Sequence, residues 1–336
     1  FTVSNGGITN LLAGDVFIND DSDLFILSSS SFNMKGTGQV QLNDLGNIDI
    51  NSGFMNIDAK ELAMNDDSSL SVTQGGKLTV DGGFLNMNQQ SSVFMSQGDI
   101  EVLQRDLNMF NSSSLELTGS NSVLTVDGGD VVLSNQSTAE LKNSAKFLVN
   151  SGESTCQDGA SVTMESSSLF SVSAGGASST FKDGCAVVVG TNAKYSSSGP
   201  TTFENDASYT LNSANIEVNA GNSVFRDNAD GTIRNSGNFI INGGSASFED
   251  DADLAISINS NFIVNAGNLD QRDTSDISIS QTGKLTVFGS VSQFNSAAIA
   301  LTSGSTLAVD GASAIFASTA FSSVNVSASS FVRIRN

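Results

Sequence analysis

The chain of 336 residues carries 35 acidic and 14 basic side chains, no histidine, no tryptophan, one proline and 32 glycines. Its net charge of -21 is spread along the sequence, which argues against binding to nucleic acid or insertion into an anionic membrane. Because 38% of the residues are hydrophobic, including 21 phenylalanines, the chain has enough apolar surface to fold, and its serine and asparagine content does not indicate disorder.

A repeat of 23 residues runs along the chain. The hexapeptide Leu-Thr-Val-Asp-Gly-Gly at 78–83 recurs at 124–129, and steps of half that separation from Val80 reach apolar or aromatic residues throughout. These anchors are Leu11, Met34, Ile57, Leu103, Val126, Val149, Val172, Tyr195, Val218, Ile241, Val264 and Val287, followed after a one-residue deletion by Val309 and Val332. A period of this length is typical of a solenoid, in which each coil packs only on its neighbours.

Each repeat is predicted to contain three short strands. An apolar residue two places before the anchor puts two side chains on one face of the first strand. A ladder of phenylalanines about seven residues later marks the second strand, and an alternating apolar pair marks the third. The ladder comprises Phe110, Phe181, Phe203, Phe225, Phe248, Phe294 and Phe316, and the third-strand pairs include Val162 with Met164, Leu254 with Ile256 and Ile277 with Ile279.

We therefore predict an all-β fold, a single-stranded parallel β-helix (β-solenoid) of about 14.5 coils with three short strands per coil. One domain would span residues 1–336, as a rod about 70 Å long. Local irregularity is expected at 98–103, where Ile100 and Val102 take the inward alternation. A second irregularity is expected at 177–209, because Pro200 cannot donate to a strand ladder.

The repeated unit consists of Asn or Lys, Phe or Leu, any residue, Val, Asp or Asn and two glycines, followed by Ser-x-Phe and an acidic corner, as at 224–229 and 247–252. This unit resembles the right-handed parallel β-helix repeats of microbial surface proteins: autotransporter passenger domains, filamentous-haemagglutinin-type adhesins and polymorphic outer-membrane proteins. The resemblance covers the whole chain. It implies a right-handed coil and an extracellular or cell-surface location, but such repeats serve packing and do not specify an activity.

Catalytic arrangements are scarce in this sequence. Without histidine there is no Ser-His-Asp or Cys-His arrangement and no histidine metal site. Paired acids such as Asp250 and Asp251 remain, but the coils carry no long insertion that would wall a substrate cleft. We predict that the protein is not an enzyme, has no resident cofactor, and serves as a rigid structural or adhesive rod: a fibre, sheath, stalk or filament subunit.

Two alternatives come from other functional classes. A ligand-binding solenoid would present outward aromatic residues toward a glycan or host surface, or a threonine ladder toward ice. The outward position before the anchor is too mixed for such a threonine ladder, and most phenylalanines are predicted to point inward. A carbohydrate-active enzyme is the third candidate, and it would need a cleft.

Four acidic residues recur at 23-residue intervals in the corner after the second strand. They are predicted to stack as one column and are the candidate divalent-cation ligands: Glu204, Asp227, Asp250 and Asp273. The preceding position alternates in sign through Arg226, Glu249 and Arg272, which would offset part of the repulsion. Because stacked like charges repel even when screened, we predict that acid or a divalent cation such as calcium stabilises this corner.

The two cysteines and the three glycosylation sequons give weaker signals. Cys156 and Cys185 fall on inward positions of different strands, which favours buried thiols over a disulfide. The sequons at Asn111, Asn135 and Asn325 are fewer than chance would give in a chain so rich in asparagine, serine and threonine, so their number carries no argument.

The two ends of the sequence read as uncapped coil faces. Residues 1–3 fit a third strand and residues 331–335 a first strand, and an exposed coil face has unpaired strand backbones. The basic pair Arg333 and Arg335 would complement the acidic first coils of another copy. We predict end-to-end self-association, which propagates because a head-to-tail contact does not close; the alternative is that the sequence is a segment of a longer chain.

Overall fold

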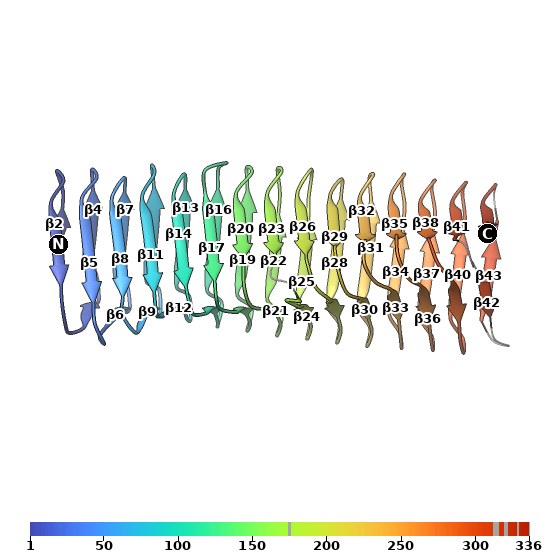
Figure 1. Ribbon diagram of the computed structural model, residues 1–336, viewed down its shortest axis with the longest axis horizontal. Coiled ribbons are helices and arrows are strands. Elements are labelled where there is room, and N and C mark those ends of the chain that lie inside the picture. Colours follow the sequence, from blue (N-terminus) through green and yellow to red (C-terminus); the bar gives the residue numbers. More distant parts are fainter. Residues whose placement is uncertain (174–175, 312–315, 319–321, 328, 336) are drawn as a thin grey trace. The chain divides into compact units, whose positions relative to one another are not determined.

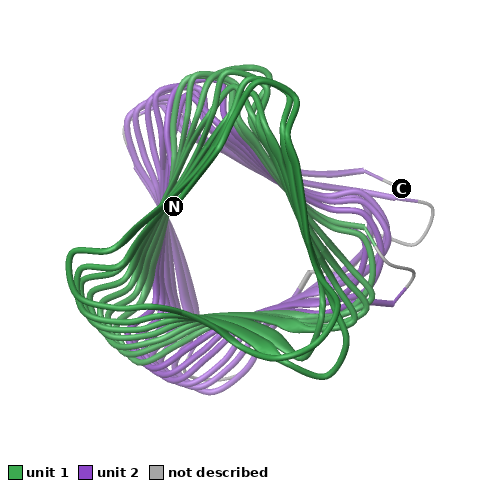
Figure 2. Cartoon of the chain, turned by 90° about the vertical axis from the view of Figure 1, so that its left-hand side faces the viewer, with its two compact units in different colours: residues 1–174 green, residues 175–336 purple. Residues whose placement is uncertain are grey.

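The computed structural model describes residues 1–173, 176–311, 316–318, 322–327 and 329–335, with the side chains of residues 316 and 318 left out. Every regular element among them is a β-strand, as predicted. The chain divides into two compact units, residues 1–174 and 175–336 (Figure 2). Each unit is a stack of three-strand coils, so the β-solenoid prediction is confirmed, and the single domain over residues 1–336 stays a prediction.

In the first unit, every third strand joins the same parallel sheet (Figure 1). Sheet A contains β1 (Thr2–Val3), β4 (Asp23–Leu27), β7 (Asn47–Asn51), β10 (Ser69–Thr73), β13 (Ser92–Ser96), β16 (Ser114–Thr118), β19 (Thr138–Lys142) and β22 (Ser161–Met164). Sheet B contains β2 (Ile8–Leu11), β5 (Ser31–Lys35), β8 (Phe54–Asp58), β11 (Lys77–Asp81), β14 (Asp99–Leu103), β17 (Val123–Asp127), β20 (Lys146–Val149) and β23 (Leu169–Val172). Sheet C contains β3 (Val16–Ile18), β6 (Gln39–Leu42), β9 (Glu61–Met64), β12 (Phe84–Met87), β15 (Leu107–Met109), β18 (Val131–Leu133) and β21 (Ser154–Cys156).

The second unit repeats the arrangement. Its sheet A contains β25 (Ala186–Val189), β28 (Ser208–Asn212), β31 (Asp230–Arg234), β34 (Asp253–Ile256), β37 (Asp276–Ile279), β40 (Ala298–Leu301) and β43 (Ser323–Val326). Its sheet B contains β26 (Lys194–Ser197), β29 (Asn215–Val218), β32 (Asn238–Ile241), β35 (Asn261–Val264), β38 (Lys284–Val287), β41 (Thr306–Asp310) and β44 (Phe331–Arg335). Its sheet C contains β24 (Ser179–Phe181), β27 (Thr201–Phe203), β30 (Ser223–Phe225), β33 (Ala246–Phe248), β36 (Leu269–Gln271), β39 (Val291–Gln293) and β42 (Phe316–Ser318).

Each strand alternates buried and half-exposed side chains because successive residues point to opposite faces of a sheet. The third-strand pairs predicted from the sequence, such as Leu254 with Ile256 and Ile277 with Ile279, are buried. Between the strands, tight turns place many non-glycine residues at positive φ. Most of these are Asn, Asp, Ser or Gln; Asn and Asp in particular tolerate the left-handed conformation.

Coil length varies around 23 residues, and this variation corrects two predicted anchors in sheet B. Val80 pairs with Val102 and not with Leu103, which confirms the irregularity expected at 98–103. In the last described coil, Val309 pairs with Ile334 and not with Val332. A fixed step fails where turns gain or lose residues, because strand pairing, not residue count, sets the register.

A third predicted anchor, Tyr195, also lies in the neighbouring inward column. It pairs with Ile216, so the buried Ser197 takes the anchor position beside Val218. The irregularity expected near Pro200 is limited to short coils, since sheet C pairs Ser179 with Thr201, a step of 22 residues. Pro200 lies directly before β27, where no ladder donor is needed from it.

The phenylalanine ladder forms the core of the second unit. Phe181, Phe203, Phe225 and Phe248 stack in sequence with ring centroids 4.8, 5.4 and 4.5 Å apart. Stacked aromatic side chains contribute both area burial and a ring-to-ring attraction. The shifted sequence positions of Phe181 and Phe203 therefore reflect short coils and not a break in the ladder.

Three other members of the predicted ladder fall outside it or cannot be placed. Phe110 is half-exposed beside the buried Met109, and Phe294 is 40% exposed because Gln293 takes the inward position. The side chain of Phe316 lies outside the described residues. Inward and outward positions differ by a single residue, so a one-residue change in turn length moves a phenylalanine to the other face.

We predict that Phe248→Ala lowers the free energy of unfolding by about 3 to 5 kcal/mol. Phe248 is fully buried and stacks on Phe225 at an interplanar angle of 9°, so truncation leaves a cavity that the neighbouring coils cannot fill. Chemical denaturation measures the loss. Phe294→Ala is the matched control, and we expect it to cost about 1 kcal/mol or less because that ring is exposed; equal losses would contradict the inward assignment.

Candidate functional site

The predicted acidic residues lie in the second unit, in the turns that link a sheet C strand to the next sheet A strand, here called the C–A corner. Asp227, Asp250 and Asp273 each lie two residues after their sheet C strand, with φ of 54°, 57° and 58°. Because their strands pair in register, these three turn aspartates stack on successive coils.

Glu204 does not belong to this stack, which corrects the predicted column. Phe203 pairs with Phe225, a step of 22 residues, so Glu204 lies level with Arg226, and Asn205 takes the place beside Asp227. Asn205 donates its amide to Asp183 at 3.0 Å. At the other end of the stack, Asn295 donates to Asp273 at 2.7 Å.

The neighbouring column carries the alternating charges expected from the sequence and includes Glu204. The Arg226 guanidinium donates to the Glu204 carboxylate through Nε at 2.8 Å and also through Nη2. Its Nε also lies 3.7 Å from the Asp227 carboxylate. Because the Arg226 side chain is 45% exposed, these contacts contribute at most about 1 kcal/mol.

A second stack of acids was missed from the sequence. Asp230 pairs with Asp253, and Asp253 with Asp276, at the start of successive sheet A strands. These strand aspartates lie three residues after the turn aspartates. The recurring pattern Asp-x-x-Asp at 23-residue intervals was the signal that could have revealed them.

Burial and like charge act together on both stacks. Burial, followed by the carboxylates of Asp227 and Asp273, raises the pKa of Asp250 above its ordinary value of 3.8. Burial also raises the pKa of Asp253, with smaller contributions from the neighbouring aspartates, although the Asp276 amide donates to its Oδ1 at 3.1 Å and opposes the shift. The corner thus holds negative charge at a cost in stability.

No group of three or more carboxylates or thiolates within the described ranges is placed to hold a metal ion. Calcium needs six to eight oxygen ligands, so a cation at this corner would act by screening the two stacks. Calcium stabilisation by Glu204, Asp227, Asp250 and Asp273 stays a prediction.

We predict that acid stabilises the second unit through Asp250. Its raised pKa means that the folded protein binds a proton at a pH where the unfolded chain does not, so the free energy of unfolding rises as the pH falls from neutral toward 3.8. Asp250→Asn should raise the unfolding midpoint at neutral pH and reduce the gain on acidification. Asp206→Asn is the control, because Asp206 accepts from the Asn228 amide at 3.2 Å. Equal effects of the two variants would contradict the stacking argument.

We also predict that calcium raises the unfolding midpoint of the wild-type protein at neutral pH and low ionic strength. The physical reason is screening of the two aspartate stacks, which the double variant Asp227→Asn with Asp250→Asn should largely remove. Thermal melts with calcium, compared with sodium at equal ionic strength, measure the effect. A wild-type midpoint that does not respond to calcium would rule out this role.

The outward face of sheet B in the second unit carries two hydrogen-bonded asparagine ladders. Asn261 donates to Asn238 at 2.8 Å, and Asn265 donates to Asn242, also at 2.8 Å. Ile263 lies between the two ladders. Asparagine both donates and accepts, so identical amides on successive coils satisfy one another and hold this face rigid.

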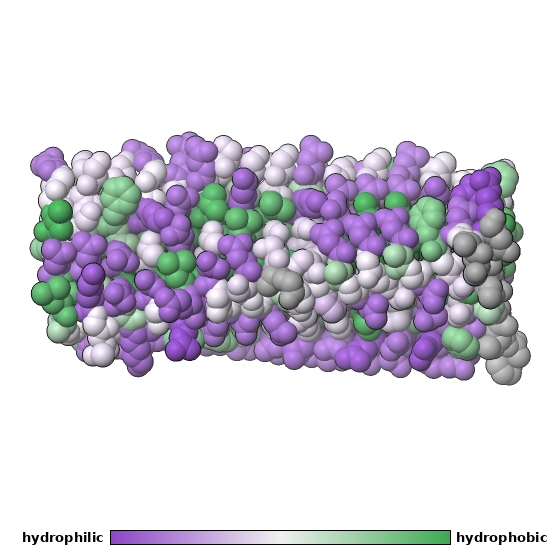
Figure 3. Space-filling model, in the orientation of Figure 1, coloured by the Kyte–Doolittle hydropathy of each residue, from purple (hydrophilic) through white to green (hydrophobic). Residues whose placement is uncertain are grey.

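Outward aromatic residues are more frequent than the sequence indicated. Of the phenylalanines whose side chains are described, nine are buried and seven are largely exposed. The Arg272 guanidinium lies 5.9 Å from the centre of the exposed Phe294 ring, and Arg105 lies 5.6 Å from that of Phe84. On the face shown in Figure 3, hydrophobic residues are scattered among hydrophilic ones.

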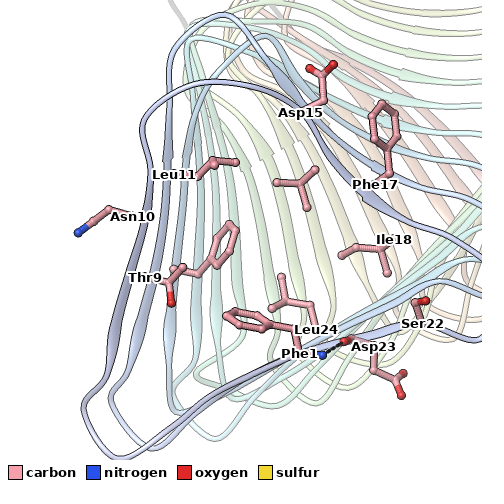
Figure 4. A pocket seen from close by; sticks show the side chains of 12 residues that line it. Phe1, Thr9, Asn10, Leu11, Asp15, Phe17, Ile18, Ser22, Asp23 and Leu24 are labelled. Carbon is pink, nitrogen blue, oxygen red and sulfur yellow. Dashed lines mark hydrogen bonds between the residues drawn. The ribbon is translucent and has the colours of Figure 1, made fainter.

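The first coil carries an open apolar hollow of about 500 Å³ (Figure 4). Its wall includes Phe1, Leu11, Phe17 and Leu24, and the Phe1 ammonium donates to the Asp23 carbonyl at 2.6 Å. In the second unit, the last described strand exposes Phe331, Val332 and Ile334. Arg333 is already paired with Asp310, so it is not a free basic group as the sequence suggested.

Both cysteines are buried, as expected, but the preference for free thiols was wrong. Cys156 and Cys185 are 1% and 0% exposed, and both are disulfide-bonded. Inward positions on different sheets of a solenoid face the same interior. Burial and disulfide formation are therefore not alternatives in this fold.

Three parallel sheets built from a repeating coil define a parallel β-solenoid protein, whose functional surfaces are its corners and sheet faces. The family model for the B subunit of the discoidin-inducing complex matches residues 53–330, which is most of the chain. The protein belongs to this family. The resemblance to autotransporter, haemagglutinin-type and polymorphic outer-membrane repeats remains a likeness of repeat pattern.

Among solved structures, the chain is similar to that of a hyper-glycosylated TibA fragment produced by TibC catalysis. The sequence identity is 13% and the TM-score is 0.38, over 93% of this chain and 99% of that chain. Comparison with curated proteins gives no match. Over the described part of the chain, no helix has the length and apolar character needed to cross a membrane.

Proposed function

We propose that this protein is a non-catalytic extracellular subunit that gives rigidity and docking surfaces to a multi-chain assembly. The observation that carries the proposal is the family assignment, because the family is described as a subunit of a discoidin-inducing complex. A β-solenoid suits such a role, since its coils hold flat sheet faces at fixed spacing. In that complex the chain would serve as a structural element that partner chains bind.

The charge distribution and the chemistry of the described residues support a structural role. The hollows along the sides of each unit are open and are lined largely by polar turn residues, as at Asp66, Gln89 and Asn111. An enzyme site needs a pocket that excludes water and holds positioned acid and base groups. The turn aspartates instead lie on an exposed corner, where their raised pKa follows from stacking.

An extracellular location is supported by the disulfide-bonded state of Cys156 and Cys185. Disulfides persist in oxidising compartments and are rare in the cytosol. The strongly acidic surface, with a net charge of -21, is consistent with a protein that stays soluble outside the cell.

Self-association through the terminal coils belongs to the same proposal. The apolar hollow beside Phe1 and Leu11 and the exposed Phe331 and Ile334 present unpaired strand edges of the kind that continue a sheet. With Arg333 held by Asp310, we expect apolar contact and strand pairing to contribute more to this junction than charge attraction.

Glycan binding is the second candidate function. Exposed rings beside guanidinium groups, as in Phe294 with Arg272, are the kind of surface on which a sugar ring stacks. Binding of soluble glycans that is lost in Phe294→Ala and kept in Phe94→Ala would favour this alternative.

We predict that native material contains this chain in a particle larger than a single chain, and that removing it abolishes assembly of the complex and discoidin induction. Light scattering coupled to size exclusion measures the particle. The variant Phe331→Glu with Ile334→Glu should reduce self-association because it buries charge at the junction. Phe288→Glu, at a similarly exposed ring, is the control. A native chain that is monomeric and dispensable for induction would overturn the proposal.

A further inference from the structure

Two of the three sequons lie at one place in the first unit. Asn111 and Asn135 each follow a sheet C strand by two residues, and Met109 pairs with Leu133, so the two asparagines occupy the same C–A corner position on adjacent coils. Both have φ of 52°, and both side chains are exposed.

The fold itself explains why a sequon arises here. In this corner of the first unit, the left-handed turn residue is followed two places later by a fully buried serine, as in Asp66 with Ser68 and Gln89 with Ser91. The same place holds Ser113 and Ser137, which are also fully buried. The corner therefore becomes Asn-x-Ser whenever asparagine occupies the left-handed position.

The equivalent asparagines of the second unit show what differs. Asn205 and Asn295 also sit in left-handed turns, but they precede Ala207 and Ala297 and so form no sequon. Their amides donate to aspartates on the neighbouring coil, as described above. These two turns share the geometry of the first-unit turns without the motif.

The amides of Asn111 and Asn135 form no side-chain hydrogen bond within the part of the chain that the structure describes, so their Nδ2 atoms face solvent. An open hollow of about 290 Å³, lined by Gln89, Gln90, Asn111 and Ser112 together with two aspartates, lies on one side. A second hollow of about 410 Å³ joins Asn111 to Asn135 and Asp158. A bulky group on either asparagine thus meets open space.

We propose that Asn111 and Asn135 are both N-glycosylated, so that two glycans stand side by side along this corner. The donor is a lipid-linked oligosaccharide pyrophosphate, used by a transferase of the secretory pathway. A bond forms between Nδ2 and the anomeric carbon, the bond from that carbon to the pyrophosphate oxygen breaks, and the lipid pyrophosphate leaves with the electron pair. The lost Nδ2 proton passes to a base of the transferase.

This modification defines which surfaces stay free. Adjacent coils are about 4.8 Å apart, so two glycans at this spacing must project together away from the corner and cover the turns beside them. Partner chains of the first unit would then dock on the other corners and sheet faces. The proposal rests on the extracellular location proposed above, because glycosylation requires the secretory pathway.

The test is glycopeptide mapping of the full chain, both native and secreted from a glycosylating eukaryotic host, before and after enzymatic release of N-glycans. We expect glycan on Asn111 and on Asn135, with conversion of each to aspartate on release. Ser113→Ala and Ser137→Ala should each remove one glycan while keeping the asparagine. Alanine fits this position, since it is found at Ala207 and Ala297 in the second unit.

A gain-of-site variant makes the test independent of loss. Gln89→Asn creates Asn-Gln-Ser on the preceding coil and should add a third glycan at the same corner, whereas Asn205 and Asn295 should stay unmodified. Unmodified Asn111 and Asn135 peptides in secreted, folded protein would overturn the proposal. If that protein still resists thiol alkylation, the extracellular role stands without the glycans; thiols that alkylate freely would instead count against the extracellular location itself.

Discussion

Parallel pairing of each strand with its equivalent one coil away is the interaction on which the rest of the structure depends. It satisfies the backbone hydrogen bonds of both units and places each side chain beside the residue at the same position of the next coil. Like therefore stacks on like. The consequence depends on the side chain: Phe225 on Phe248 adds ring attraction, Asn238 on Asn261 forms a hydrogen bond, and Asp227 beside Asp250 adds repulsion.

The polar columns show how the chain accommodates this constraint. Asparagine can donate to one neighbour and accept from the other, so it extends along a column without a charge penalty. Aspartate cannot, and the stack of turn aspartates ends in Asn205 and Asn295. The adjacent Glu204 and Arg226 alternate in sign. The remaining repulsion makes this corner the part of the second unit most sensitive to protons and cations.

The same constraint shapes the proposed function. A coil that repeats at fixed spacing leaves little room for a deep pocket along its sides, but it offers flat faces and regular corners to other molecules. Membership of a family described as a complex subunit fits such a surface. Within the first unit, the corner that carries Asn111 and Asn135 would be covered by glycan, and the remaining corners and faces would stay available to partners.

The sequence by itself determined the fold class, because a 23-residue apolar period with inward alternation can be satisfied by stacked coils and by few other arrangements. It also located the C–A corner and the alternating Glu204 and Arg226 neighbourhood. Register was decided only by the tertiary structure: coils shorten or lengthen by a residue or two, and a one-residue shift exchanges inward and outward side chains. Thus Phe294 lies outside, Glu204 leaves the aspartate stack, and Asp230, Asp253 and Asp276 form a second stack. The oxidation of Cys156 and Cys185 was likewise beyond the sequence, because it depends on which inward side chains approach one another in the folded interior.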